Sequence, residues 1–434
     1  MRSIGIENVG RELVDSAFDE RFSKLTSVFQ PIVDLRTGLV VAHEALTRWP
    51  AFPDTPPEQI FAMARTAGMI EELDRACIAA AVTAAAQFSP TDREPRTLFV
   101  NIEADAIPSE NASTSARQLG ELLRAGGSQI RPVAEFAERS LLTDPARLLR
   151  SADRLRRDGI IIALDDVGAD PDSMVVMPLL APEVIKLDRS LLDDDLSDVK
   201  LATLFAVLDY ASRFNVALIA EGIETERHRD KALAWGAVYG QGFLLGRPAA
   251  LDVSPTSAFP VQPRPPVQIP LTEILDDRAT DTTSISVLAS ISDHLLDFAL
   301  TTSETLTIVI AFREPEMCTA EMARTLQHLA RKHPYVAALD APRALFTATD
   351  RVRHADLAQP SERIGAIAVV GQRFYCALVA RPLDADAPAS PSNQWKYYFT
   401  VEPAQVCTAA HTLIVHSASP TDPAPDRHIS GGLE

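Results

Sequence analysis

Short apolar runs alternate with longer helical stretches through the first half of the chain. Each run ends at a polar residue, and a stretch rich in Ala, Leu and Arg follows most of them. This rhythm is typical of parallel strands joined by helices. About eight strands in about 220 residues favour an α/β fold of the (β/α)8 barrel type over an open sheet. The runs are Phe29–Val33, Leu39–Ala42, Leu98–Val100, Val133–Ala134, Ile160–Leu164, Val184–Leu187, Val216–Ala220 and Ala237–Tyr239.

A different pattern follows a proline-rich segment. Six prolines between Pro255 and Pro270 interrupt helix and sheet alike, so we predict a semi-rigid linker over 251–269. A proline-rich loop within one domain is the alternative. Beyond it the sequence predicts a smaller mixed α/β domain over 270–418. Its expected helices are Ile285–Leu300, Thr319–Lys332 and Pro403–Val415, and its expected strands are Leu306–Phe312, Ile364–Val370, Phe374–Ala380 and Tyr397–Val401.

The remaining segments carry weaker patterns. Residues 1–21 are charged and amphipathic and predict a helical lead-in to the barrel, which we place at 22–250. Residues 384–393 predict a mobile loop, and residues 419–434 predict a disordered tail.

Charge and cysteine content limit the classes of partner. The chain has 41 basic and 59 acidic residues, a formal net charge of −18, which argues against DNA and anionic membranes as broad partners. The four cysteines are far apart, without a Cys-x-x-Cys pair, and the N-terminal residues do not have the pattern of a signal peptide. No apolar run reaches the roughly 18 residues of a membrane helix. These features predict a cytoplasmic protein with reduced thiols and no membrane insertion.

Ionisable or amide side chains stand where most barrel strands end, and these ends meet at one rim in a parallel barrel. Capping of the following helices is the alternative for each carboxylate, but capping does not explain a lysine. Asp165 and Asp166 are adjacent, so both can face the rim only if the strand ends there. The residues are Glu44, Asn101, Glu135, Asp165, Asp166, Lys186, Asp188, Glu221 and Gln241.

So many carboxylates at one rim would repel one another unless cations lay among them. The absence of His and Cys from these positions favours Mg²⁺ or Mn²⁺ over Zn²⁺. A carboxylate between two metal ions is the usual arrangement for phosphodiester hydrolysis. Lys186 would orient or deprotonate the attacking water, or offset charge on the phosphate.

The sequence around these residues resembles the EAL-domain family of cyclic di-GMP phosphodiesterases from about residue 22 to 250. Glu44-Ala45-Leu46 lies in the context of the family signature, and the other motifs keep the family's order and spacing. They are NIEADAI at Asn101, VAEFAERS at Glu135 and Glu138, IALDDVG at Asp165 and Asp166, VIKLDRSLL at Lys186 and Asp188, IAEGIET at Glu221 and Glu224, and GQGFLLGRP at Gln241.

The resemblance implies a modified TIM barrel that hydrolyses cyclic di-GMP to linear pGpG with two Mg²⁺ or Mn²⁺ ions. It implies that Lys186 holds or activates the catalytic water, and that Glu44, Asp165 and Asp166 are also catalytic. The metal ligands that it implies are Glu44, Asn101, Glu135, Asp165, Asp166 and Glu221. Gln30, Arg48, Asp188 and Gln241 are expected around the substrate, and Glu138 and Glu224 behind it as supports. The family also implies a homodimer through the barrel.

Two segments depart from the family pattern. The first is Val167–Ser173, where active members usually have the sequence Phe-Gly-(Thr/Ala)-Gly-Tyr-Ser-Ser. The second is Glu103, which stands at the serine position of the usual Asn-x-Ser motif that begins at Asn101. The loop supports metal binding and dimer contact in the family. Three hypotheses therefore remain: a phosphodiesterase, a receptor that binds cyclic di-GMP without cleaving it, and a scaffold that does not bind it.

The C-terminal domain weakly resembles the DICT sensory module through its length, its position and the strand around Ile310. We therefore expect it to regulate the barrel in response to an unidentified signal or partner. Its scattered histidines suggest no metal site. The aromatic cluster Trp395–Phe399 is interpreted as a strand packed on a core, with a ligand platform as the alternative. No GGDEF-type cyclase motif is present.

Overall fold

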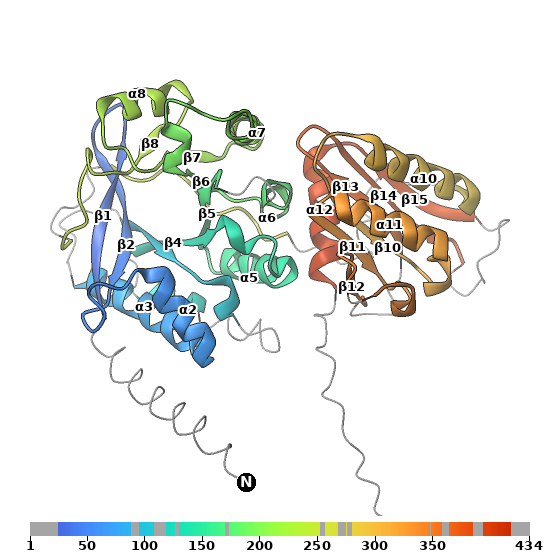
Figure 1. The fold of residues 1–434 in the computed structure, drawn as a ribbon, viewed down its shortest axis with the longest axis horizontal. Coiled ribbons are helices and arrows are strands. Elements are labelled where there is room, and N and C mark those ends of the chain that lie inside the picture. Colours follow the sequence, from blue (N-terminus) through green and yellow to red (C-terminus); the bar gives the residue numbers. More distant parts are fainter. Residues whose placement is uncertain are drawn as a thin grey trace, which may run out of the picture. The chain divides into compact units, whose positions relative to one another are not determined.

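The computed structural model divides the chain into two compact units, Met1–Pro266 and Val267–Glu434 (Figure 1). Each unit is described by itself below. The structure describes residues 25–87, 95–107, 119–125, 130–169, 173–251, 257–267, 275, 280–347, 349–357, 364–384 and 394–417. The predicted lead-in helix and C-terminal tail lie outside these residues, as does nearly all of the loop predicted at 384–393.

The first unit is a closed barrel of eight strands in chain order, which confirms the predicted fold class. Strands β2 to β8 pair in parallel, each with the next along the chain. The strands are β1 (Thr26–Asp34), β2 (Val40–Arg48), β3 (Arg96–Asn101), β4 (Ile130–Ala137), β5 (Ile161–Val167), β6 (Val184–Leu187), β7 (Ala217–Ala220) and β8 (Tyr239–Gly240).

Strand β1 departs from the all-parallel arrangement that the sequence predicts. It runs antiparallel to both β2 and β8. Only residues 35–39 connect β1 to β2, which is enough for a hairpin but too short for the crossover that a parallel pair needs. Gly38 has φ +74° in this turn. The barrel is therefore a modified (β/α)8 barrel that opens with a hairpin.

Helices surround the barrel, and several begin where a side chain caps them. The Asp144 carboxylate accepts a hydrogen bond from the Arg147 backbone N–H at the start of α5, and Ser197 and Thr225 cap α7 and α8 in the same way. The helices are α2 (Pro57–Ala67), α3 (Ile70–Ala86), α5 (Pro145–Arg157), α6 (Met177–Leu180), α7 (Asp198–Phe214) and α8 (Glu226–Ala234).

Part of the predicted linker packs on the barrel. Phe259 is 1% exposed and belongs to the apolar cluster inside the barrel, with its ring 5.6 Å from that of Phe99. The Arg131 Nη1 donates to the Phe259 carbonyl at 2.7 Å, and the Arg264 backbone N–H donates to the Glu183 carboxylate at 2.8 Å. Residues 257–266 therefore belong to the first unit, because a phenylalanine side chain anchors a segment that its prolines alone would leave extended.

The second unit contains a mixed seven-stranded sheet in the order β12-β11-β10-β13-β14-β15-β9. Strand β10 pairs in parallel with β11, which pairs in parallel with β12, and the other pairs are antiparallel. The strands are β9 (Asp281–Ser284), β10 (Thr307–Ala311), β11 (Tyr335–Leu339), β12 (Arg353–Ala355), β13 (Gly365–Val370), β14 (Tyr375–Pro382) and β15 (Gln394–Thr400).

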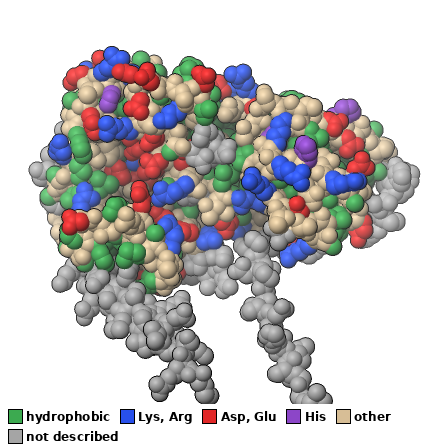
Figure 2. Space-filling view, viewed as in Figure 1, with side chains coloured by type: hydrophobic (Ala, Val, Ile, Leu, Met, Phe, Trp, Pro, Cys, Tyr) green, Lys and Arg blue, Asp and Glu red, His purple; other side chains and the backbone are tan. Residues whose placement is uncertain are grey.

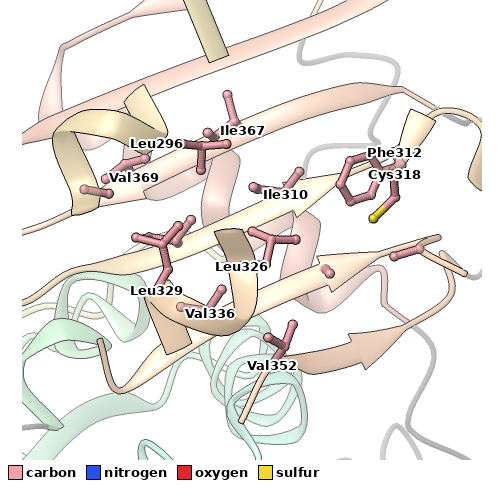
Figure 3. Close-up of a cluster of buried hydrophobic side chains, with 14 of the residues drawn as sticks. Leu296, Ile310, Phe312, Cys318, Leu326, Leu329, Val336, Val352, Ile367 and Val369 are labelled. Atoms are coloured by element: carbon pink, nitrogen blue, oxygen red, sulfur yellow. The ribbon is translucent and has the colours of Figure 1, made fainter. Parts of the chain in front are cut away.

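Three helices cover this sheet. Helices α10 (Ile285–Thr301) and α11 (Ala320–Lys332) lie on one face, where Leu296, Leu326 and Leu329 join Ile310 and Ile367 in the core (Figure 3). Helix α12 (Pro403–Val415) packs on β13, β14 and β10 from the other face. The helices match the predicted ones closely, whereas β9, β11 and β12 were not predicted.

Among the described residues, no helix combines the length and the apolar character needed to cross a membrane.

Candidate active site at the carboxyl ends of the barrel strands

The barrel places the predicted polar residues at one rim because they stand at or just after the carboxyl ends of consecutive strands. Glu44 lies in β2, Asn101 ends β3, Glu135 lies in β4 and Lys186 in β6. Asp165 and Asp166 lie near the end of β5, and Glu221 and Gln241 directly follow β7 and β8. Figure 2 shows acidic side chains gathered in the middle of the barrel, with Lys and Arg side chains around them.

Lys186 lies at the centre of this group. Its side chain is 1% exposed, and its Nζ contacts four carboxylates. The partners are Glu221 Oε1 at 2.8 Å, Glu135 Oε1 at 2.9 Å, Asp165 Oδ1 at 2.9 Å and Glu44 Oε2 at 3.2 Å. The lysine thus joins β2, β4, β5 and the end of β7 across the barrel interior.

Two amide side chains hold Glu44 in place. The Asn101 Nδ2 donates to Glu44 Oε1 at 3.0 Å, and the Gln241 Nε2 donates to Glu44 Oε2 at 2.6 Å. Gln241 Nε2 also donates to Gln30 Oε1 at 3.0 Å, and Gln30 Nε2 donates to the Gly246 carbonyl at 3.1 Å. These hydrogen bonds fix both oxygens of a carboxylate that is 5% exposed.

The carboxylates form two groups that share one member. Oxygens of Glu44, Glu135 and Asp165 lie within 4.8 Å of one another, and so do oxygens of Asp165, Asp166 and Glu221. Asp166 has φ +58°, in the left-handed region, so the backbone leaves its extended path there and both aspartates can face the rim. Asp165 is the one carboxylate that belongs to both groups.

The electrostatics show an excess of negative charge. Burial raises the pKa of Glu135 and of Glu221 well above the usual value, and neighbouring carboxylates add to the effect. Burial and the Asp165 charge raise the pKa of Asp166 to about 6. Burial opposes the charge of Lys186, but the surrounding carboxylates outweigh it and raise the lysine pKa. One ammonium thus faces five carboxylates.

This donor set fits divalent metal ions. Glu135 is 0% exposed, and its Oε2 has no hydrogen-bond partner among the residues that the structure describes. A buried carboxylate oxygen without a partner is costly, and a cation would satisfy it. The ligands are all oxygens of carboxylates and one carboxamide, as hard cations such as Mg²⁺ and Mn²⁺ prefer. The arrangement can therefore hold cations in two adjacent positions.

A cavity of about 490 Å³ lies beside the carboxylates. Asn101 and Asp166 line it, together with the cations Arg48, Arg65 and Arg139. Arg48 is exposed and donates only to the Thr47 carbonyl among the hydrogen bonds described, so its charge is free to meet an anion. The rings of Trp49 and Phe61, 6.1 Å apart and edge to face, form an aromatic wall. The cavity combines cationic and aromatic surface.

Three other predicted residues lie around the centre. The Asp188 carboxylate accepts from the Ser190 N–H at 3.0 Å, beside Asp166. Glu138 is 1% exposed and accepts from the Gly168 N–H at 3.2 Å, directly after the paired aspartates. Glu224 pairs with Arg189 at 2.8 and 3.0 Å. Glu138 thus contacts the loop that follows β5, and Glu224 contacts the segment that follows β6.

The segment that departs from the family pattern is only partly described. Gly168 has φ +106°, and a Cβ there would come within 2.6 Å of Leu191, so this glycine is required. Val167 is fully buried, and its carbonyl accepts from the Asp188 N–H at 3.0 Å. Asp170, Pro171 and Asp172 lie outside the described residues.

Sequence reasoning missed part of the cavity wall. Asp74, on α3, is buried and accepts from the Glu103 N–H at 3.2 Å, and burial raises its pKa well above the usual value. Arg65, on α2, pairs with Glu103 and Asp105. Neither residue follows a strand, so the pattern of polar residues at strand ends could not identify them. The one available signal was Asp74 itself, an aspartate just before an apolar helical run.

Comparison with known proteins agrees with this geometry. The model of the EAL domain matches residues 15–248, more than half of the chain. A cyclic di-GMP phosphodiesterase of Pseudomonas aeruginosa is 28% identical over 251 residues, 54% of this chain and 42% of that protein. A probable cyclic di-GMP phosphodiesterase of Escherichia coli is 28% identical over 246 residues, 56% of this chain and 46% of its own length. The chain thus spans less than half of these curated relatives.

Two solved structures are similar to about half of the chain. The MucR phosphodiesterase of Pseudomonas aeruginosa in complex with cyclic di-GMP is 24% identical, with a TM-score of 0.44, over 53% of this chain and 98% of that one. A manganese and cyclic di-GMP complex of BlrP1 from Klebsiella pneumoniae is 26% identical, with a TM-score of 0.44, over 52% and 56%. The matched family model, which ends just before the proline-rich segment, identifies the barrel: the chain belongs to the EAL domain family.

Proposed function

We propose that the barrel is a metal-dependent phosphodiesterase that hydrolyses cyclic di-GMP to linear pGpG. The observation that carries the proposal is the pair of carboxylate groups that share Asp165 and surround Lys186. Relatives named as cyclic di-GMP phosphodiesterases match the same part of the chain. The excess of carboxylates over cations explains why the reaction would need metal ions.

Six residues would hold two divalent ions, either Mg²⁺ or Mn²⁺. Bound ions would polarise the phosphodiester and lower the pKa of a bound water, which is the chemistry that two-metal sites supply. Asn101 and Gln241 keep Glu44 oriented, and Glu138 fixes the loop after Asp166 through the Gly168 N–H. The proposed ligands are Glu44, Asn101, Glu135, Asp165, Asp166 and Glu221.

Lys186 would act as a cation and a hydrogen-bond donor. Without bound metal ions the surrounding carboxylates raise its pKa, and the protonated amine can orient a water oxygen or a phosphate oxygen. It is also the residue that fixes the spacing of four carboxylates. These contacts support a positioning and charge-stabilising role for Lys186.

The cavity beside the carboxylates would take the rest of the nucleotide. Arg48 presents a guanidinium that can bind two phosphate oxygens, and Trp49 and Phe61 offer apolar surface for a purine. Gln30 and Gln241 are hydrogen-bonded to each other beside Glu44, and Asp188 lies next to Asp166. The proposed substrate contacts are therefore Gln30, Arg48, Asp188 and Gln241.

The proposal is tested with purified full-length protein and cyclic di-GMP in Mg²⁺, Mn²⁺ or chelator, with pGpG measured by chromatography. We expect metal-dependent pGpG that Glu44→Ala reduces by about a hundredfold or more, because even residues behind metal ligands cost up to that factor. Glu72→Ala, which removes an exposed carboxylate from α3, is the matched control and keeps full activity. Full turnover by Glu44→Ala would contradict the mechanism.

A receptor that binds cyclic di-GMP without cleaving it is the second candidate. The departure of Val167–Ser173 from the family pattern favours it, because this loop follows two proposed metal ligands. Calorimetric binding at micromolar or tighter affinity without pGpG would support the receptor. A scaffold without nucleotide binding is the least supported candidate, since all six proposed ligands and Lys186 are present. Whether the barrel is a phosphodiesterase or a receptor, the C-terminal unit would regulate it. The family resemblance also implies a homodimer formed through the barrel.

A further inference from the structure

One departure from the family pattern lies on the wall of the barrel cavity. Glu103, at the serine position of the motif that begins at Asn101, lines this cavity together with Asp166. Its half-buried carboxylate pairs with Arg65 of α2, and its Oε1 lies 3.6 Å from Nη2 of Arg139, just after β4. A serine could form neither ion pair. The glutamate therefore connects two arginines from different elements at this wall.

The main chain of Glu103 is also held in place. Its N–H donates to the buried carboxylate of Asp74 at 3.2 Å, which joins the segment after β3 to α3. Arg65 is held by two carboxylates, because its Nε donates to Asp105 and its Nη2 donates to Glu103. The charge and the donors of Arg65 are thus used within the wall.

Arg139 differs from Arg65 in the use of its donors. Its 3.6 Å contact with Glu103 is too long for a hydrogen bond, and its guanidinium donates no other hydrogen bond to the described residues. The side chain lines the cavity, is 59% exposed and carries five donors in a planar fork. An exposed ion pair of this kind contributes little to folding. Glu103 therefore restrains Arg139 by charge and leaves its donors available for an acceptor in the cavity.

The charge of Arg139 reaches the carboxylate cluster. Burial and the Asp165 charge raise the pKa of Asp166, and the positive charge of Arg139 acts in the opposite direction. Arg139 and Asp166 line the same cavity, as does Arg48. An anion that binds beside Asp166 would therefore lie in the electrostatic field of the Arg139 guanidinium.

We propose that Arg139 binds the phosphate of the cyclic dinucleotide that lies nearest Asp166, and that Glu103 positions the guanidinium for this contact. The inference rests on the proposed function, because the phosphate belongs to the proposed substrate. A guanidinium fork can donate to two phosphate oxygens at once, and such charge-assisted hydrogen bonds are strong. Arg139 would thus be a substrate contact that the motifs of the family do not include.

Arg139→Gln tests the contact, because it removes the charge from an exposed side chain. Full-length protein is assayed with cyclic di-GMP and Mn²⁺. The readout is KM for pGpG formation, or the calorimetric Kd if the dinucleotide is bound without cleavage. We expect either constant to rise about tenfold or more, and kcat to change by less than about threefold, since a contact made equally in both states affects binding alone.

Arg157→Gln is the matched control. Arg157 is exposed on α5, makes no ion pair with the described residues and does not line the cavity, so neither constant should change. Ionic strength gives a second readout. Raising KCl from about 0.05 M to about 0.5 M should weaken binding by the unaltered protein more than by Arg139→Gln, because salt screens the charge pair that the variant lacks.

Glu103→Gln tests the positioning role through the sign of its effect. Removal of a carboxylate beside an anion would by itself tighten binding, because a repulsion is lost. Loss of the restraint on Arg139 weakens binding instead. We expect KM or Kd to rise about threefold in the unaltered background, and to fall or stay constant in the Arg139→Gln background, since residues that act through one contact are not additive.

Three results would overturn the proposal while the proposed function stands. The first is an Arg139→Gln protein that behaves as Arg157→Gln does, and the second is equal salt dependence with and without Arg139. The third is tighter binding by Glu103→Gln in the unaltered background. In all three the unaltered protein still binds or cleaves cyclic di-GMP, whereas a protein that does neither would overturn the proposed function together with this contact.

Discussion

The ammonium of Lys186 is the only positive charge within contact of four buried or half-buried carboxylates among the described residues. Each carboxylate loses hydration inside the barrel, and the lysine compensates part of that loss. Removal of one partner from such a group leaves uncompensated buried charge, which destabilises more than the intact group stabilises. The residue is thus expected to matter for folding as well as for turnover.

We predict that Lys186→Met lowers the free energy of unfolding of the metal-free barrel by about 3–5 kcal/mol. The methionine keeps the volume and removes the charge, so the carboxylates repel one another. Urea unfolding, followed by Trp49 and Trp235 fluorescence in a Trp395→Phe background, measures the change. Added Mn²⁺ should restore more stability in the variant than in the unaltered protein, because a bound cation stabilises only the folded state.

Lys200→Met is the matched control for this experiment. Lys200 lies on α7, and its ammonium makes no ion pair with the described residues. We expect a change within about 1 kcal/mol, as for an exposed charge. A Lys186→Met barrel as stable as this control would show that the carboxylates are neutralised by protonation instead.

His333 gives the second unit a pH-dependent stability. Its Nδ1 accepts from the Leu306 N–H at 3.2 Å, its Nε2 contacts the Ala299 carbonyl at 2.9 Å, and burial lowers its pKa below the usual 6.5. Below pH 6.5 the unfolded chain binds a proton that the folded chain does not. Stability is therefore retained above this pH and falls as pH falls from 6.5 toward the folded pKa. Urea unfolding followed by Trp395 fluorescence, with Trp49 and Trp235 replaced by Phe, measures it.

His333→Gln should reduce this dependence between pH 7 and pH 5, since glutamine does not titrate there. Some dependence remains because burial also lowers the pKa of His354. His328→Gln, an exposed change on α11, is the control and should leave the slope unchanged. Equal slopes in all three proteins would refute the assignment to His333.

At the scale of residues, the sequence predicted the rim because a polar residue after an apolar strand is visible in the pattern. It could not predict that Lys186 contacts four carboxylates at once, because that depends on barrel closure. Asp74 and Arg65 were missed for a related reason: they lie on helices, where facing the site depends on how α2 and α3 pack. Asp166 was predicted at a strand end, and its positive φ is the local conformation that this placement needs.

At the scale of elements, residues 257–266 are part of the barrel unit and not only a connection between the units. Phe259 belongs to the apolar cluster that buried side chains of β1 to β7 form inside the barrel. Glu183 forms a buried ion pair with Arg156 at 2.9 Å, and its carboxylate also accepts a hydrogen bond from the Arg264 backbone N–H of this segment. The segment thus seals the end of the barrel opposite the carboxylates and satisfies a buried charge there.

Phe259→Ala should destabilise the barrel by about 3–5 kcal/mol, the usual cost of a large cavity in a core. Gln262→Ala, an exposed change in the same segment, should have little effect. The barrel tryptophan fluorescence described above provides the measurement. A Phe259→Ala barrel as stable as Gln262→Ala would mean that the segment lies only loosely on the barrel.

Elements with a distinct period were predicted well. The amphipathic pattern predicted α11, and the turn at Gly371 predicted the β13–β14 hairpin. Strand β12 was missed because it has three residues without an apolar run, and β11 because a short buried run beside a helix carries no period. The Phe259 anchor was missed because the segment was interpreted from its prolines, and not from the apolar side chains of Phe259 and Val261 that pack between them.

At the scale of the whole molecule, the division between the units falls after Pro266 and not at the start of the proline-rich segment. We predict that a chain ending at residue 266 retains the barrel's thermal stability. A chain ending at residue 250 should unfold roughly 6–20 °C lower, because it lacks Phe259 and Arg264. Differential scanning calorimetry measures both, and identical midpoints would contradict this boundary.

Lys186 has one more consequence for how the barrel would acquire ions. An ammonium already within 2.8–3.2 Å of four carboxylates is a tethered competitor that every arriving cation must displace in part. A monovalent ion offers no more charge than the lysine and gains little by the exchange, whereas a divalent ion gains a full extra charge. The lysine would thus exclude Na⁺ and K⁺ from the barrel, and so act as a selectivity filter for the site.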